Sequence, residues 1–410
     1  MDAASARTYA LASNAELRAQ IPALSDDEVA LDGAAGTQVP EAVIAAVGEA
    51  MRSAMSNVGG AFAASRISTE TVSEARKAVA DLVGGVADGV VLGPSMTALT
   101  FRIAAALAKS WGRGDEVVVS SLDHDANIRP WRIAAERAGA AVRIADFDPE
   151  SGELPVSAVE AALSERTRLV AMTAASNAIG TRPDVAAICQ RAHDAGALTY
   201  IDGVHATPHM PTDVGAIGAD FYACSSYKFC GPHAGAVVAD PALLDSLHPD
   251  KLVPSPSSVP HRFERGTSPF ELLAGVRAAI DWLADLTDAE GSRRERLVAS
   301  LAAIERSLEP LLAQMVEGLA AIDGVRILGA PRHRTPTVSF TIDGRRPEAV
   351  VEALAERRIA VWAGDNYACE LMARFGLGRS GGAIRASIVL YNNADEVARF
   401  LEAVEGIAGR

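Results

Sequence analysis

The chain has 410 residues, of which 49% are hydrophobic and 22% are charged, so it is long enough to bury one large core or two moderate ones. Its net charge of −14, without a basic block or basic helix, argues against a nucleic-acid or membrane surface as its partner. Residues 1–5 begin no signal-peptide pattern, and no apolar run approaches the roughly 18 residues of a membrane span. Its four cysteines form no CxxC pair. We therefore expect a globular, cytoplasmic protein without a disulfide framework.

Seven short apolar runs alternate with amphipathic stretches in the first 240 residues, a pattern typical of a mostly parallel α/β sheet. We predict strands at 89–92, 116–120, 141–145, 169–173, 197–202, 221–224 and 234–239. Among the helices between them, one at 72–83 is predicted to begin with a capping box at Thr71 and Glu74 and to end at Gly84.

The pattern changes at residues 251–266, where three prolines stand among serines and no periodicity survives, which indicates a loop. Beyond it we predict helices at 269–286, 293–319, 347–357 and 395–404, and strands at 337–342 and 384–390. We expect three parts: an N-terminal segment (1–50) that packs on the small domain, a large domain (51–290) and a small C-terminal α/β domain (291–410).

An acid and a lysine stand at the ends of two predicted strands. Asp202 ends the run at 197–202, and Lys228 follows the run at 221–224. Pyridoxal phosphate (PLP) requires both, because its aldehyde forms a Schiff base with lysine and its pyridinium nitrogen needs an anion to hold its proton. Ser225 and Tyr227, next to the lysine, would reach the phosphate. We therefore predict a PLP site at this edge of the sheet.

Other predicted strands also end in polar groups. Ser95 and Thr97 stand where a helix begins after the strand at 89–92, and a helix N-terminus suits a phosphate, although Ser there is more often an ordinary N-cap. His124 is a candidate to stack on the pyridine ring, or a surface histidine among acids. Asn177 could bond the phenolic oxygen of the cofactor, or simply belong to a turn.

His205 and His209 form the one pair that suggests a metal, but Pro208 interrupts their spacing and no further ligands accompany them. We therefore predict no metal site. A nucleotide-binding oxidoreductase is also disfavoured, since no Gly-x-Gly-x-x-Gly turn follows an early strand.

In combination, the motifs Asp-His-Asp-Ala-Asn at 123–127, Ser-Asn at 176–177, Asp-Gly-Val-His at 202–205 and Ser-Ser-Tyr-Lys at 225–228 resemble those of a known family. The chain resembles fold-type I PLP enzymes of the class V aminotransferase family, and within it the cysteine desulfurase-like proteins. The resemblance runs from residue 31 to residue 387. It implies an α/β fold with a large domain on a mostly parallel seven-stranded sheet and a small α/β C-terminal domain.

The resemblance implies roles for matching residues. Lys228 would carry the cofactor, Asp202 would face its ring nitrogen and His124 would stack on its ring, so these three are the predicted catalytic residues. Arg385 would bind the substrate carboxylate through a bidentate pair that fixes its orientation, and Asn57 would belong to a loop that walls the substrate. The predicted cofactor contacts besides the catalytic three are Ser95, Met96, Thr97, Asn177, His205, Ser225, Tyr227 and Thr267.

Some of these positions depart from the family pattern or involve a second subunit. His205 stands where desulfurases usually have Gln and Tyr227 where they usually have His, and both can still form hydrogen bonds. Thr267 matches a residue that reaches the neighbouring subunit's cofactor, which implies a homodimer.

The nucleophilic cysteine of desulfurases has no counterpart in the matching segment. Tyr367 occupies its position, and Cys369 follows two residues later in a helical pattern, where two residues turn a side chain to about the other face. We therefore expect the cofactor machinery without the persulfide machinery.

The leading interpretation is a PLP enzyme acting at Cα of a small amino acid by desulfurase-like C–S lyase chemistry without a persulfide cysteine. A class V aminotransferase and an amino-acid epimerase share the early steps and stay open. A non-catalytic protein that keeps the fold is the alternative from another class, and the presence of both Asp202 and Lys228 counts against it.

Overall fold

The computed structural model describes residues 8–53 and 55–409. Residues 1–5, which concern the expectation about a signal peptide, lie outside the described part. Its largest sheet has seven strands in the order β2-β8-β7-β6-β5-β3-β4. They are β2 (Val90–Gly93), β3 (Glu116–Ser120), β4 (Ala141–Ala145), β5 (Thr167–Thr173), β6 (Leu198–Asp202), β7 (Phe221–Ser225) and β8 (Gly235–Ala239). The run from β7 to β4 is parallel, and β8 is antiparallel to both of its neighbours. The predicted fold class and all seven predicted strands are confirmed.

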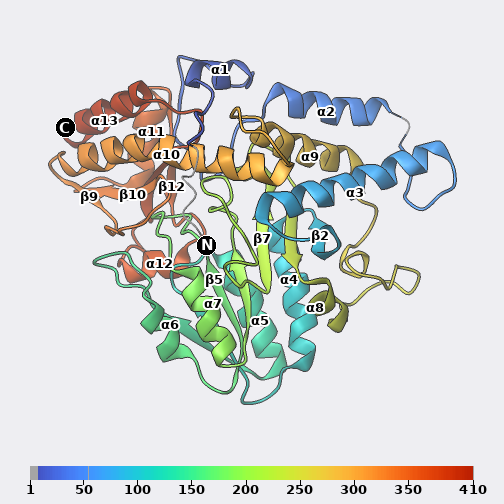
Figure 1. The fold of residues 1–410 in the computed structure, drawn as a ribbon. Helices are drawn as coiled ribbons and strands as arrows, with labels where there is room; N and C mark the ends of the chain where they lie inside the picture. The colour runs from blue at the N-terminus through green and yellow to red at the C-terminus, as the bar shows by residue number, and fades with distance from the viewer. Residues whose placement is uncertain (1–7, 54, 410) are drawn as a thin grey trace.

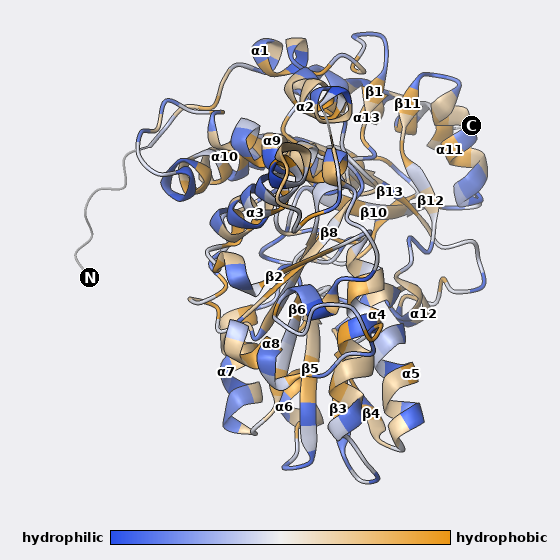
Figure 2. Ribbon diagram, turned by 90° about the vertical axis from the view of Figure 1, so that its right-hand side faces the viewer, coloured by the Kyte–Doolittle hydropathy of each residue, from blue (hydrophilic) through white to orange (hydrophobic). Residues whose placement is uncertain are grey.

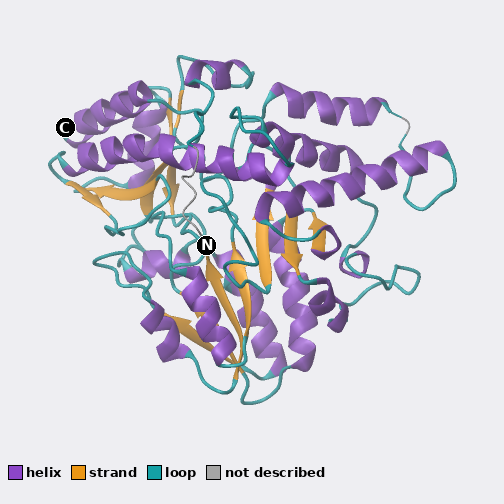
Figure 3. Ribbon diagram, in the orientation of Figure 1, coloured by secondary structure: helices purple, strands orange, loops and turns teal. Residues whose placement is uncertain are grey.

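Helices cover both faces of this sheet (Figures 1 and 3). Alternate residues of a strand face opposite sides: Val117 and Val119 of β3 pack in the cluster with α4 and α5, and Val118 packs in the other cluster. The first cluster contains α4 (Met96–Leu107), α5 (Arg129–Ala138) and α8 (Pro241–Ser246), and the second contains α3 (Ala63–Val83), α6 (Val156–Ala162), α7 (Val185–Asp194) and α9 (Phe270–Ala284). Figure 2 shows the apolar strands between helices whose outer faces are hydrophilic.

A second, antiparallel sheet lies in the C-terminal part, in the order β12-β13-β10-β9. Its strands are β9 (Val325–Ile327), β10 (Thr337–Ile342), β12 (Trp362–Gly364) and β13 (Ala383–Ser387), with helices α11 (Pro347–Ala355), α12 (Cys369–Arg374) and α13 (Ala394–Ala408). The long helix α10 (Arg293–Ala320) passes from α9 to α13 (Figure 1). This helix begins with a capping box formed by Ser292 and Glu295.

The N-terminal segment reaches this second sheet. After α1 (Asn14–Ala19), β1 (Val29–Ala30) pairs in parallel with β11 (Ile359–Ala360), and Asp32 forms a bridge with Ser387. The segment then returns through α2 (Glu41–Arg52), which packs on α9. The part of the segment around β1 therefore packs against the C-terminal part, and α2 packs against a helix of the large sheet. The division of the chain at about residues 50 and 290 stays a prediction.

Several predicted boundaries differ in the structure, and the largest difference is at the start of α3. Helix α3 begins at Ala63, not at residue 72, and Thr71 lies inside it with its hydroxyl donating to the Ile67 carbonyl at 2.9 Å. The predicted capping box is therefore wrong, because its hydroxyl bonds back along a helix that already exists. The end at Gly84 is confirmed by its left-handed φ of 73°. Strand β13 ends at Ser387, short of the predicted residue 390.

The segment at 251–266 contains one short 3₁₀ turn, His261–Phe263, and otherwise irregular chain, as predicted. None of the described helices is both long and apolar enough to cross a membrane.

Candidate active site

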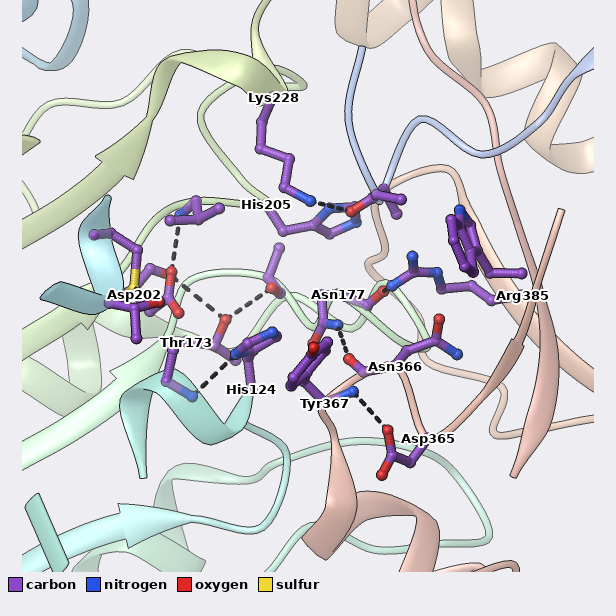
Figure 4. A pocket seen from close by; sticks show the side chains of 18 of the residues that line it. His124, Thr173, Asn177, Asp202, His205, Lys228, Asp365, Asn366, Tyr367 and Arg385 are labelled. Atoms are coloured by element: carbon purple, nitrogen blue, oxygen red, sulfur yellow. Dashed lines mark hydrogen bonds between the residues drawn. The ribbon is translucent and has the colours of Figure 1, made fainter. Parts of the chain in front are cut away.

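A cavity of about 360 Å³ lies where the carboxyl ends of the parallel strands face the C-terminal sheet, the usual place for a ligand in an open α/β sheet. Polar groups from separate elements converge in it (Figure 4). Of the predicted site residues, nine line it: Met96, Thr97, His124, Asn177, Asp202, His205, Tyr227, Lys228 and Arg385.

Asp202 is the last residue of β6 and is 6% exposed. Its Oδ1 accepts from the Val204 amide at 2.9 Å, and burial raises the pKa of this carboxyl to about 6. A cation placed beside it would favour its ionised form and would gain from the exclusion of water. Asp202 is therefore suited to hold a proton on a pyridine nitrogen.

Lys228 ends the 3₁₀ turn that follows β7, and its side chain extends into the cavity (Figure 4). Its ammonium donates to the Ala34 carbonyl. Burial lowers the pKa of this amine to about 7, with Arg385 lowering it further and Asp202 opposing the shift. A good fraction of the amine is therefore neutral near pH 7, as a nucleophile or base requires.

The chain has four lysines, and the other three have surface partners. Lys77 pairs with Glu74, Lys109 with Asp250, and Lys251 donates to the Ser255 carbonyl. Lys228 is thus the lysine that the fold places opposite the buried acid.

His124 caps the short turn after β3, and its Nδ1 accepts from the Ala126 amide at 3.0 Å. Burial lowers the pKa of His124 to about 4, so its ring is neutral at physiological pH. One face of the ring stacks on Tyr367, with centroids 5.3 Å apart and planes 21° apart. A neutral ring held in this way can stack on a second aromatic ring.

Arg385 of β13 is 5% exposed and donates to the Asn177 carbonyl at 3.0 Å. Burial lowers its pKa to about 10, which still leaves the guanidinium charged at neutral pH. The Asp32 carboxylate opposes this shift, but no salt bridge joins Arg385 to an acid of the described residues. Its charge is therefore available to a carboxylate.

The Asn177 side chain donates through Nδ2 to the Asn366 carbonyl at 2.9 Å. Its buried Oδ1 has no hydrogen-bond partner within the described chain. An acceptor of this kind fits a phenolic hydroxyl.

The residues predicted for the phosphate lie around the N-terminus of α4. The Ser95 hydroxyl caps this helix by accepting from the Ala98 amide at 3.1 Å, so the N-cap alternative is confirmed, and Met96 and Thr97 line the cavity. The buried Ser225 hydroxyl has no partner within the described chain. A free hydroxyl and a helix N-terminus are donors that suit a phosphate. Two orphaned polar atoms, on Ser225 and Asn177, therefore stand where PLP contacts were predicted, and the site fits this cofactor.

Tyr227 and His205 complete the predicted contacts. The Tyr227 ring lies 4.9 Å from the Lys228 ammonium and stacks on His233. His205 is 3% exposed, and its Nε2 lies 3.0 Å from the Thr337 hydroxyl. His209 lies beside it with ring centroids 5.2 Å apart, and no group of three or more metal-ligating side chains gathers anywhere in the described residues.

Four predicted residues lie outside the lining of the cavity in this single chain. Ser95 and Ser225 stand within two residues in sequence of side chains that line the cavity. Asn57 and Thr267 are both exposed and do not line it. Their predicted roles, one of which needs a second subunit, stay predictions.

Several lining residues were not assigned a role from the sequence. Ala34 and Ala35 come from the segment after β1, and Trp362, Asp365 and Asn366 come from β12 and the turn beyond it. These segments lie far from the main motifs in sequence. The one local signal is the pair Asp365-Asn366 after an apolar run, which is typical of a turn but does not place the turn at the cavity.

Comparison with known proteins decides the family. Residues 29–400 match the family described as aminotransferase class-V. The chain belongs to this family of PLP-dependent enzymes. The predicted family, cofactor and enzyme class are thereby confirmed.

Several relatives of this family member carry the name of the predicted subgroup. An uncharacterized protein of Mycobacterium tuberculosis is 35% identical over 96% of this chain and 98% of its own. A probable cysteine desulfurase of Pseudomonas aeruginosa is 34% identical, covering 95% of this chain and 96% of its own. The crystal structure of the cysteine desulfurase CsdA of Escherichia coli has a TM-score of 0.84 at 29% identity, covering 97% and 98% of the two chains. This member of the class-V aminotransferase family is thus cysteine desulfurase-like.

Proposed function

We propose that the protein is a C–S lyase, which eliminates a sulfur substituent from Cβ of an amino acid and passes no sulfur to a cysteine of its own. The observation that carries the proposal is the side chain at the cavity wall. Tyr367 lines the cavity, and the resemblance to desulfurases implies that it stands where they carry the nucleophilic cysteine.

The nearby thiol is poorly suited to replace that cysteine. Cys369 begins α12, does not line the cavity, and donates to Asp365 Oδ2 at 3.3 Å. Burial and the Asp365 carboxylate raise the pKa of Cys369 to about 11. The thiolate is the nucleophile, and at neutral pH almost none is present.

Four of the lining side chains have a part in the elimination. Arg385 binds the substrate carboxylate, and Lys228 takes the proton from Cα. When bound, PLP supplies an electron sink for the charge that develops at Cα, and Asp202 holds the ring proton on which that sink depends. His124, whose ring stacks on Tyr367, would stack on the cofactor ring.

The products balance without an oxidant. The Cα–H bond breaks and its proton goes to Lys228; the Cβ–S bond breaks and its electron pair leaves with sulfur, which becomes a thiol after protonation. The remaining 2-aminoacrylate takes up water and gives pyruvate and ammonia. A persulfide route would instead give alanine.

Product analysis with L-cysteine tests the proposal. We expect sulfide and pyruvate in equal amounts, unchanged in Cys369→Ala and abolished in Lys228→Ala. Formation of alanine in place of pyruvate, or loss of activity in Cys369→Ala, would revive the persulfide route. Formation of a keto acid from the amino acid with sulfur retained would favour the aminotransferase alternative.

We also propose a homodimer in which Thr267 reaches the partner's cofactor. Large apolar side chains are exposed on α2, on the start of α3 and on the segment before Thr267: Ile44, Met51, Phe62, Ile67, Leu252 and Val253. These elements lie on the same side of the molecule (Figure 1). An exposed apolar surface of this kind marks an interface.

A further inference from the structure

The outer wall of the cavity carries two aromatic side chains that the cofactor contacts do not use. Trp362 and Tyr367 line the cavity although 51% and 70% of their surface is exposed. Large apolar side chains in water at the edge of a ligand cavity indicate a contact with the ligand. The rest of this wall is small: Ala34, Ala35, Ala363 and Gly364.

Trp362 stands next to the arginine assigned to the substrate carboxylate. It lies directly opposite Arg385 in the antiparallel pair of β12 and β13. Residues directly opposite in such a pair project from the same face, with Cβ atoms about 5 Å apart. The indole therefore lies beside the guanidinium to which the substrate carboxylate is assigned.

Tyr367 is held in place despite its exposure. Asn366 and Tyr367 both adopt left-handed backbone conformations, with φ of 52° and 57°. The Tyr367 amide donates to Asp365 Oδ1 at 2.9 Å, and its carbonyl accepts from the Asp125 amide at 2.7 Å. Two successive non-glycine residues in this region are strained, and such strain clusters at ligand sites. The ring is thus a fixed part of the wall.

The charges around this wall disfavour an acidic side chain. The two cations of the cavity, Lys228 and Arg385, are already used by the Cα chemistry and the carboxylate. The remaining charged group in the wall is Asp365, whose carboxylate accepts from the Tyr367 amide and the Cys369 thiol. Together with Asp125 it helps to raise the pKa of Cys369. A second carboxylate on the substrate would meet negative charge and no free cation.

We propose that the cavity takes amino acids whose Cβ sulfur carries an uncharged aryl or alkyl group, that is, thioethers of cysteine, with the substituent packed against Trp362 and Tyr367. This substrate class rests on the proposed C–S lyase function. The substituent displaces water from the rings of Trp362 and Tyr367, and it leaves together with the sulfur as a thiol.

Binding of unreactive amino acids tests the side-chain site separately from the reaction. L-homophenylalanine has the shape of S-phenylcysteine without a leaving group, and L-alanine lacks the substituent. The PLP-loaded protein is titrated with L-homophenylalanine, L-alanine and L-glutamate while the cofactor absorption is followed. We expect L-homophenylalanine to bind at least about tenfold more tightly than L-alanine, as burial of one aromatic group implies, and L-glutamate to bind more weakly than L-alanine.

Variants at the indole give the matched comparison. In Trp362→Ala the dissociation constants for L-alanine and L-homophenylalanine should differ by no more than about threefold. In Trp362→Phe most of the preference for L-homophenylalanine should remain. Equal affinity for L-alanine and L-homophenylalanine, tighter binding of L-glutamate, or an unchanged ratio in Trp362→Ala would overturn the side-chain site alone. A protein whose cofactor absorption responds to no amino acid would overturn the proposed function as well.

Discussion

At the scale of single residues, the site depends on two groups that burial drives toward neutrality. Burial raises the pKa of Asp202 to about 6 and lowers that of Lys228 to about 7. Both line one cavity with Arg385, which favours the neutral amine further. Near pH 7 the acid is mostly ionised while about half of the amine is free, the combination that capture of an aldehyde requires.

This balance predicts a pH dependence for cofactor uptake. The neutral fraction of Lys228 rises with pH, so the rate at which the cofactor-free protein incorporates PLP should rise through pH 7 and be about tenfold below its plateau at pH 6. Absorbance stopped-flow measures it. Arg385→Ala removes a nearby cation and should move the midpoint to higher pH. A rate that is flat from pH 6 to 8 in the unaltered protein would contradict the assigned pKa.

At the scale of elements, the strands of the large sheet could be predicted from the sequence, and the walls of the cavity could not. Each strand of the large sheet is a short apolar run that ends in polar groups, and parallel strand ends share one edge of a sheet. That logic places Asp202, Asn177 and Lys228 together without tertiary information. The start of α3 was missed because the Thr71 and Glu74 pattern fits a helix interior as well as an N-cap.

The turn at 364–368 depends on contacts from distant segments. Asn177 and Asp125 hold its carbonyls, and two left-handed residues shape it. Neither the contacts nor the strained conformation follows from local propensity. A family pattern could therefore align Tyr367 with the desulfurase cysteine, but the position of its ring could not be predicted from the sequence. The pairing of Lys228 with the Ala34 carbonyl likewise joins segments 194 residues apart.

The N-terminus of α4 makes a prediction at the element scale. A Cβ added at Gly235 in β8 would overlap the backbone of Ser95 and Met96, whereas one added at Gly112 would meet nothing within 4 Å. Gly235→Ala should therefore displace the proposed phosphate contacts, lowering PLP affinity and the free energy of unfolding by about 1–3 kcal/mol.

Denaturant unfolding and PLP titration measure the two effects. Gly112→Ala is the control and should change neither. If a folded Gly235→Ala protein binds PLP as tightly as the unaltered protein, the N-terminus of α4 does not contact the phosphate.

At the scale of the whole molecule, the fold brings the end of one sheet against the edge of another. The cavity takes Arg385 and Trp362 from the C-terminal sheet and its acid and lysine from the large sheet. The long helix α10 and the pairing of β1 with β11 connect the parts that carry these residues. A shift between the two sheets would therefore change the substrate contacts before the cofactor contacts.

The proposed homodimer makes a prediction at this scale. Aspartate at both Met51 and Ile67 places charge in the exposed apolar surface, so the double variant should be a monomer by light scattering. It should also lose PLP faster on dialysis, because the proposed dimer brings Thr267 of the partner subunit to the cofactor. Ile144→Asp, at an exposed position on the edge strand β4, is the control and should stay dimeric. A double variant that remains dimeric would place the interface elsewhere.

The chemistry proposed for the site requires that one particular amine bonds to PLP. Borohydride reduction of the yellow protein, followed by peptide mass spectrometry, identifies that amine among the four lysines of the chain. The account predicts a reduced cofactor label on Lys228 and none on Lys77, Lys109 or Lys251. A label on any of those three, or a colourless protein that takes up no added PLP, would contradict it.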